Sequence, residues 1–297
     1  MGKLYSTLIL LSIIWGTSFL FIKILLEDMG PAAVVFGRCI FGFVTLAILA
    51  LIKHEKIAFK ELPWKKLFLV GFLNNALPWL FISTSEMKIS SSLASILNAT
   101  TPIWTLIIGS VFFASALKRN QWIGIAFGFV GIFIISDIKP GELLSGNLSG
   151  VLLILGGAIC YGAGAHLTKR YLLHLSTLHI SLFTLFVASI ISFVMMMVMT
   201  PVSIYAFKEI SVILPLIGLG SLGSGLAYLL YYFLVKKGSP EFASLVTYLA
   251  PASAIIWGAF ILEEEIHVSM ILGLLIIFAG IYIASLKRKK AENKAAA

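Results

Sequence analysis

Charged residues are scarce in this sequence. Only 12% of its 297 residues are charged and 60% are hydrophobic, whereas an ordinary soluble domain carries about 25% charged residues. A soluble fold of this length could not bury so much apolar surface. We therefore expect the chain to fold in a lipid bilayer and predict the bilayer as a partner of the protein.

Signatures of catalysis and of ATP use are also missing. The sequence has no phosphate-binding loop of the G-x-x-x-x-G-K-[ST] type, and its apolar runs hold no His/Cys/Asp cluster at metal-ligand spacing. Cys39 and Cys160 lie within apolar runs, where we expect them to pack as small hydrophobic side chains without a disulfide framework. These absences predict no enzyme activity, no cofactor and no metal.

Ten apolar runs follow one another along the chain. Each is near the ~20 residues that cross the hydrocarbon core at ~1.5 Å per residue, and none shows the alternation of a spanning β-strand. The first is too long for a signal peptide and no cleavage site follows it, so we expect it to be retained. We predict an all-α polytopic membrane protein with ten transmembrane helices. The predicted spans are residues 4–26, 31–52, 64–84, 90–114, 121–137, 148–170, 177–199, 210–233, 240–262 and 269–286.

The basic residues predict an orientation for these spans. Ten spans place both termini on one side. Of the 22 lysines and arginines, 17 fall on that side, four on the other and Arg38 within a span. Because cytoplasmic loops carry the excess of Lys and Arg, we expect a plasma-membrane protein with both termini cytoplasmic. The net charge of +9 is then a topology signal, and we expect no nucleic-acid partner.

One unusual phrase occurs twice. Residues 92–102 read SLASILNATTP, and residues 241–251, which lie 149 positions later, read EFASLVTYLAP. Further positions match at offsets of 146 or 149. These pairs are Trp15/Tyr161, Lys23/Lys169, Trp79/Tyr228, Ser90/Ser239, Gly124/Gly273 and Gly131/Gly280.

The matches predict two five-helix repeats. They cover residues 1–137 and 148–286, and a basic cytoplasmic tail, 287–297, follows. Because five is an odd number, the second repeat enters the membrane from the opposite face. Such inverted repeats are the architecture of many secondary transporters, whose site lies near the midplane between the halves.

The repeated phrase places a stripe of small and weakly polar residues on one helix face. Pro102 and Pro251 cannot donate to the carbonyls of Asn98 and Thr247, and such carbonyls are tolerated only against protein or a water-filled cavity. One interpretation is close helix packing. The other is a solute cavity with Asn98 and Thr247 as ligands, which we favour because an amide facing lipid is costly.

Matched aromatic residues are further candidates for the site. Trp15 and Tyr161 occupy equivalent positions in the two halves, as do Trp79 and Tyr228, and Asn75 is nearby in sequence. They are expected to form either the walls of a solute cavity or ordinary helix packing. Both interpretations stay open.

Arg38 is the charge that we place well inside a span. It lies seven residues past Pro31, about 10 Å along a helix. Its side chain either reaches the headgroups or points into the bundle, where it would anchor helix-end carbonyls or attract an anionic solute group. We expect no clearly buried carboxylate as its partner, so proton coupling has no support. We expect His166 to be interfacial or hydrogen-bonded rather than a proton carrier, and Glu263–Glu265 to be a solvated rim.

The sequence resembles one known family over nearly its whole length. The residues that carry the resemblance are Trp15-Gly16-Thr17, Lys23, Arg38 after Pro31, and the block Ala243–Pro251 with Glu264, Gly273 and Gly280. They are similar to those of the EamA-like drug/metabolite transporters. The resemblance implies an exporter or permease of small metabolites, amino acids or drugs, with a cavity lined by the first, third and fourth helices of each repeat.

One departure from the family pattern matters. Ser115 stands where the first repeat often has a counterpart of Glu264, which excludes a role for that carboxylate in both halves. We therefore predict a secondary exporter that moves a small-molecule solute by alternating access. A non-transporting membrane receptor or assembly factor is the alternative; it should expose a sizeable domain, and the longest loop, 53–63, is too short for one.

Overall fold

The computed structural model describes residues 2–55, 59–113, 119–136, 146–199 and 209–285, and within these ranges it contains helices and no strand. The first half comprises α1 (Gly2–Asp28), α2 (Pro31–Ile52), the short 3-10 helix η1 (Phe59–Glu61), α3 (Trp64–Gly71), the π-helix η2 (Phe72–Ala76), α4 (Leu77–Glu86), α5 (Ser91–Asn98), α6 (Thr101–Phe113) and α7 (Arg119–Ser136). The second half comprises α8 (Gly146–Tyr171), α9 (Thr177–Met199), α10 (Ile210–Leu216), the π-helix η5 (Ile217–Leu226), α11 (Ala227–Lys237), α12 (Pro240–Ser244), α13 (Val246–Ile261) and α14 (Val268–Ser285).

Each predicted span coincides with a helix or with consecutive helices. In the described part of the chain, eight helical stretches are long and apolar enough to cross a membrane, and α7 and α14 contain shorter apolar segments. Large apolar side chains also point outward; Phe133, Val198 and Phe260 are 74%, 78% and 83% exposed. Such a surface suits lipid rather than water, so the protein is a polytopic helical membrane protein.

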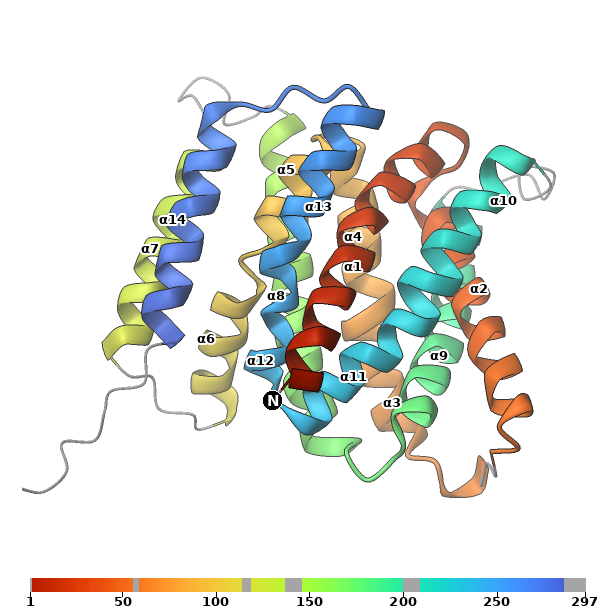
Figure 1. Cartoon of the computed structure of the whole chain (residues 1–297). Helices are drawn as coiled ribbons and strands as arrows, with labels where there is room; N and C mark the ends of the chain where they lie inside the picture. The colour runs from red at the N-terminus through yellow and green to blue at the C-terminus, as the bar shows by residue number, and fades with distance from the viewer. Residues whose placement is uncertain (1, 56–58, 114–118, 137–145, 200–208, 286–297) are drawn as a thin grey trace, which may run out of the picture.

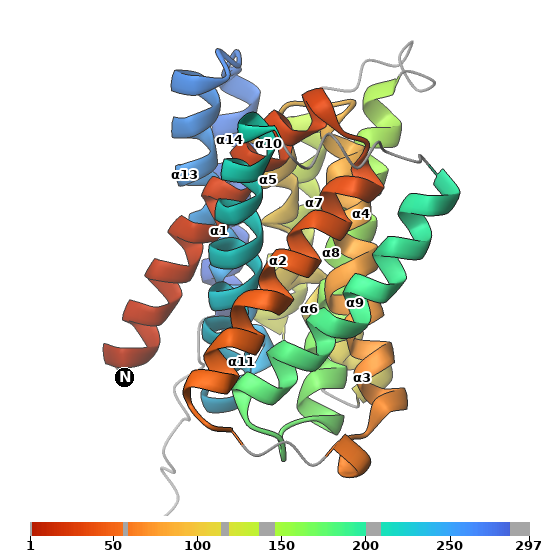
Figure 2. The ribbon, with the colours of Figure 1, turned by 90° about the vertical axis from the view of Figure 1, so that its right-hand side faces the viewer.

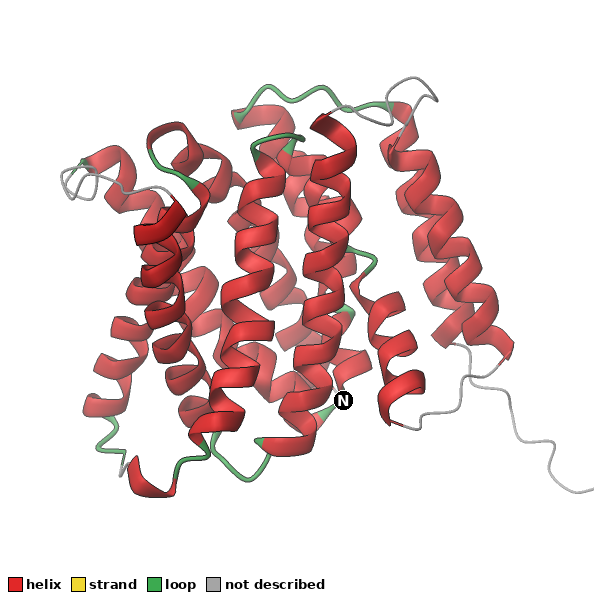
Figure 3. Cartoon of the chain, turned by 180° about the vertical axis from the view of Figure 1, so that it is seen from behind, coloured by secondary structure: helices red, strands yellow, loops and turns green. Residues whose placement is uncertain are grey.

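The helices run side by side between two faces (Figures 1 and 3). The upper face, at the top of Figure 1, carries the α1–α2, α4–α5 and α13–α14 connections. The lower face carries the N-terminus and the α2–α3, α8–α9 and α11–α12 connections. Figure 2 views the flank formed by α2 and α9, which pack together.

Helices α7 and α14 form a closely packed pair at the opposite flank (Figure 1). A Cβ atom on Gly131 of α7 would lie 2.8 Å from the Gly273 carbonyl oxygen of α14. Because only glycine permits this approach, small residues here let two membrane helices touch through their backbones. Gly131 and Gly273, one glycine from each of the matched pairs Gly131/Gly280 and Gly124/Gly273, thus meet across one helix interface.

The third span of each half contains a π-helix. These are η2, between α3 and α4, and η5, between α10 and α11. The glycine-rich η5 lies against α2, where a Cβ atom on Gly42 would be 3.0 Å from the Gly220 carbonyl oxygen. Arg38 precedes Gly42 by about one turn on α2. The close approach therefore brings the arginine against the π-helix, whose irregular backbone is typical of functional positions.

Candidate functional site

A small cavity lies at the centre of the bundle, between helices of both halves. Its volume is about 30 Å³, which is room for about two water molecules at the ~10–15 Å³ that each requires. The lining residues are Trp15, Ser18, Phe19, Ile22, Arg38, Trp79, Ile82, Asn98, Tyr161, Thr247 and Ala250. They come from α1, α2, α4, α5, α8 and α13.

The cavity brings together most of the residues predicted from the sequence. Six of the eight candidates line it: Trp15, Arg38, Trp79, Asn98, Tyr161 and Thr247. Tyr228 lies behind this wall, with its ring centroid 5.7 Å from that of Trp15 and 5.4 Å from that of Trp79. Asn75 does not line it; its amide is fully buried in η2, where neither polar atom has a hydrogen-bond partner among the described residues.

Arg38 points into the bundle and not toward the headgroups. Its side chain is 3% exposed, and its Nε donates a 3.0 Å hydrogen bond to the Ser224 hydroxyl in η5. Its guanidinium carbon lies 3.8 Å from the centroid of the Trp79 ring, a cation–π contact that favours a partly desolvated cation. The headgroup-reaching alternative for Arg38 is thus wrong, and the bundle-facing interpretation holds.

The π-helices supply polar groups that hold the cavity walls. Ser224 donates to the Leu219 carbonyl 2.9 Å away, five residues earlier, and the Trp15 indole donates to the Gly223 carbonyl at 3.1 Å. In η2, the Asn74 carbonyl accepts a 2.8 Å hydrogen bond from Tyr228. These carbonyl and hydroxyl contacts hold Arg38, Trp15 and Tyr228 in place. Trp15 lines the cavity, whereas Tyr228 packs behind it.

The carbonyl that Pro102 leaves without its usual donor is satisfied locally. The Thr101 hydroxyl donates to the Asn98 carbonyl oxygen at 2.7 Å, whereas it lies 3.5 Å from the Asn98 side-chain oxygen. The backbone group is therefore paired, and the Asn98 amide is only weakly engaged. This leaves the amide as a hydrogen-bonding group at the cavity wall.

The structure corrects our expectation that no carboxylate is buried. Glu86, the last residue of α4, is 0% exposed. The predicted third span ended at residue 84, which placed Glu86 in a connecting loop; α4 continues two residues further. The signal that could have found it is spacing: Glu86 follows Trp79 by seven residues and Ile82 by four, which puts all three on one helix face.

The expectation that Glu264 belongs to a solvated rim is also wrong. Its carboxylate accepts hydrogen bonds from the Ser91 N–H at 2.6 Å, the Ser92 N–H at 3.0 Å and the Ser92 hydroxyl at 2.6 Å. It thereby caps the N-terminus of α5 from the other half, where a negative charge is favourable. Its neighbours Glu263 and Glu265 are exposed, as expected of a rim.

His166 has the hydrogen-bonded environment predicted for it. The ring is 5% exposed, and its Nε2 lies 3.0 Å from the Thr105 carbonyl oxygen. The ring also stacks on Phe113. His166 is therefore held between α8 and α6, away from the residues that line the central cavity.

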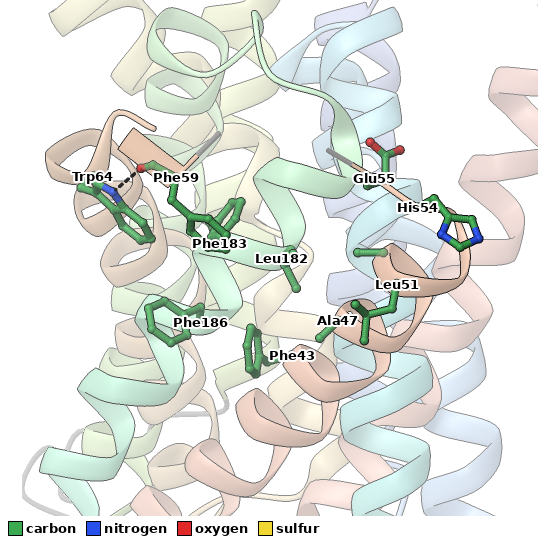
Figure 4. A pocket seen from close by; sticks show the side chains of 11 residues that line it. Phe43, Ala47, Leu51, His54, Glu55, Phe59, Trp64, Leu182, Phe183 and Phe186 are labelled. Carbon is green, nitrogen blue, oxygen red and sulfur yellow. Dashed lines mark hydrogen bonds between the residues drawn. The ribbon is translucent and has the colours of Figure 1, made fainter. Parts of the chain in front are cut away.

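A larger cavity lies elsewhere, between the C-terminal part of α2 and the N-terminal part of α9 (Figure 4). Its volume is about 740 Å³, and its lining is mostly apolar and aromatic, with Phe43, Trp64 and Phe183 prominent. His54 and Glu55 lie at its margin (Figure 4). Because it lies on the flank of the bundle and lacks convergent polar groups, we do not assign the solute to it.

Fold and cavity together define a helical membrane protein that encloses a polar and aromatic chamber between two halves. The chain belongs to the EamA-like transporter family, whose model matches residues 3–137 and 148–286. This confirms the resemblance drawn from the sequence. The protein is therefore a membrane transporter by family.

Proteins named as transporters are similar to this chain over most of its length. An uncharacterized transporter of Archaeoglobus fulgidus is 24% identical over 287 residues, 96% of this chain and 100% of that protein. The uncharacterized inner membrane transporter YedA of Escherichia coli is 28% identical over 260 residues, 86% of this chain and 81% of YedA. A solved crystal structure that is 14% identical, covering 96% of this chain and 97% of that chain, has a TM-score of 0.73, which shows a shared fold.

Proposed function

We propose that this transporter exports small organic metabolites, amino acids or drugs by alternating access, and that its solutes carry an anionic group. The supporting observation is the cavity: Arg38 is buried, and none of the described lining residues is acidic. A buried cation is costly without a counter-charge. A solute carboxylate or phosphate at Arg38 would supply one, with Asn98 and Thr247 as hydrogen-bonding partners and Trp15 and Tyr161 against its apolar part.

Alternating access is supported by the size of the cavity. A site for a small organic ligand has a volume of ~300–1,000 Å³, which is about ten to thirty times the 30 Å³ found here. The chamber is thus too small for such a solute, which could bind only if the helices around it move apart. At the upper face the Glu264 contacts with α5 hold the two halves together.

We also propose that α7 and α14 cross the membrane, which gives ten spans in two inverted repeats. The separate family matches to residues 3–137 and 148–286 support this division. Helix pairing supports it too, because α1 packs on α13 as α8 packs on α6, and α2 on η5 as α9 packs on α3 and η2. Both third spans contain a π-helix at matched positions.

The orientation that follows puts the upper face outside the plasma membrane and both termini in the cytoplasm. Single cysteines test it in a background in which both buried native cysteines are alanine. In intact cells an impermeant thiol reagent should modify cysteines at Met87 and Glu263, and should spare those at Lys60 and Lys237, all four being exposed positions. The reverse pattern would overturn the orientation.

Flux measurements on purified protein test the transport proposal. Liposomes with and without the protein are loaded with a metabolite mixture, and the solutes that leave are measured by mass spectrometry. We expect solutes that bear a carboxylate or phosphate to leave faster through the protein, and unlabelled solute on the opposite side to accelerate labelled exchange. Equal leakage from both kinds of liposome for every solute would overturn the proposal.

A further inference from the structure

Glu86 is placed where a transported proton could be held. Its carboxyl is fully buried, and neither oxygen has a hydrogen-bond partner among the described residues. It follows the cavity residue Ile82 by four positions, about 6 Å further along the same face of α4. The carboxyl therefore lies beyond the cavity on the side of the upper face.

The charged groups around Glu86 are occupied by other partners. Lys23 of α1, Glu264 and Arg38 of α2 act on it electrostatically. The Lys23 ammonium donates to the backbone carbonyls of Glu86 at 2.7 Å and Ile89 at 3.3 Å, not to the carboxyl. Glu264 is bonded to the N-terminus of α5, and Arg38 to Ser224.

An ionised Glu86 would thus be a buried charge without a hydrogen-bonded partner. Such a charge is so costly that the group neutralises instead, which for a carboxylate means that it binds a proton. Ionisable side chains in membrane spans are functional candidates and are typical of proton relays. The small chamber, with room for about two waters, suits a transporter that returns with a proton and without solute.

We propose that Glu86 is the proton-binding site that couples this transporter to a proton gradient, an inference that rests on the proposed transport function. With the upper face open, one Glu86 carboxylate oxygen takes a proton from external water. The closed bundle holds the resulting O–H group. When the lower face opens, the O–H bond breaks and the proton passes to water in the chamber, while Lys23, which is bonded to the Glu86 backbone carbonyl, is available to pair with the carboxylate. One proton enters as the solute leaves.

Infrared difference spectroscopy tests proton binding without any solute. We expect lipid-reconstituted wild-type protein at neutral pH to show a protonated-carboxyl band that is lost in Glu86→Gln. Glu241→Gln, which alters a partly exposed acid near the lower face, should keep the band, and Glu86→Asp should keep a shifted one. A wild-type protein without the band, or a Glu86→Gln variant that retains it, would overturn the proposal.

Flux in liposomes tests the coupling. With a solute identified by the mixture experiment, we expect an imposed pH gradient to drive accumulation by wild type and by Glu241→Gln. Glu86→Gln should lose this accumulation yet keep solute exchange at equal pH. Retained gradient-driven accumulation, or loss of exchange as well, would overturn the coupling role. If wild type moves no solute, the transport proposal fails separately, and the infrared band still decides whether Glu86 binds a proton.

Discussion

The two copies of the repeated phrase interrupt their helices at different points. In the first copy α5 ends at Asn98, and α6 begins at Thr101, one residue before Pro102. In the second copy the interruption falls at Leu245, between α12 and α13, and α13 continues through Pro251. The shared proline therefore does not decide by itself where the helix breaks.

Hydroxyl groups account for the difference. In the first copy, Thr100 and Thr101 each donate to the carbonyl three residues earlier, both at 2.7 Å. In the second, Ser244 and Thr247 do the same at 2.8 Å, and these residues flank the break at Leu245. Side chains that bond to nearby carbonyls offer the backbone an alternative to the helix. The positions that match Thr100 and Thr101 are Leu249 and Ala250, which have no hydroxyl.

A second difference concerns charge. Arg38 has Thr184 as its counterpart in the second half at an offset of 146, and the Thr184 hydroxyl contacts Tyr232 at 3.3 Å. The halves thus share backbone architecture, whereas the two charged groups, Arg38 for the solute and Glu86 for the proton, belong to the first half.

Arg38→Gln should reduce solute flux most strongly. Truncating one partner of a buried charged hydrogen bond costs ~2–5 kcal/mol, which corresponds to a loss of about 30-fold or more at ~1.4 kcal/mol per factor of ten. Arg38→Lys should fail too, because an ammonium lacks the planar fork of the guanidinium. The measurement is exchange in liposomes, with Thr184→Val as the matched control from the other half. Normal exchange by well-folded Arg38→Gln would refute the role of Arg38.

Asn98→Leu should reduce flux more than Thr247→Val, although the two positions match in the repeat. The Thr247 hydroxyl already bonds to the Ser244 carbonyl, whereas the Asn98 amide is only weakly engaged. We expect about tenfold for Asn98→Leu, since a lost buried polar contact costs ~1–3 kcal/mol. Exchange is measured beside thermal stability. If Asn98→Leu lowers the thermal stability as much as it lowers the exchange rate, Asn98 serves helix packing and does not bind the solute.

Glu264→Gln should loosen the contact between the two halves at the upper face. The counterpart of Glu264 in the first half is Ser115, a residue outside the described ranges. Weakening the three contacts by ~1 kcal/mol would raise the open population about fivefold. The readout is the rate at which an impermeant thiol reagent modifies a cysteine at Ile89, a 6% exposed position. Glu263→Gln, at an exposed neighbour, is the control. An unchanged rate would mean that Glu264 does not hold this face closed.

Much of this arrangement was predictable from the sequence. Hydropathy placed the helical stretches within a few residues of their observed bounds, and the repeated phrase led to Asn98 and Thr247, which line the same cavity. Glu86 was missed because hydropathy ends a span where polar residues begin, while the α4 backbone continues past Ser83 and Ser85. Capping of α5 by Glu264 joins residues more than 170 positions apart, and no local pattern encodes such a contact.

Thr101→Val should destabilise the fold slightly more than Thr105→Val, which tests the hydroxyl explanation directly. Both side chains are buried, both substitutions are nearly isosteric, and both remove a hydroxyl bond to a carbonyl. The Thr105 hydroxyl bonds to the Thr101 carbonyl at 2.9 Å within α6, where the helical N–H four residues on is also a donor. The Asn98 carbonyl has proline at that position, so without Thr101 it is left unpaired.

Hydrogen bonds between side chains in membrane proteins average about 0.6 kcal/mol and reach about 1.7, whereas leaving a buried acceptor unpaired costs ~1–3 kcal/mol. We therefore expect about 1–2 kcal/mol for Thr101→Val and about half or less for Thr105→Val. The measurement is reversible unfolding in mixed detergent micelles. If the two variants lose the same stability, the Thr101 hydroxyl is not what compensates for Pro102, and the different breaks in the two copies need another cause.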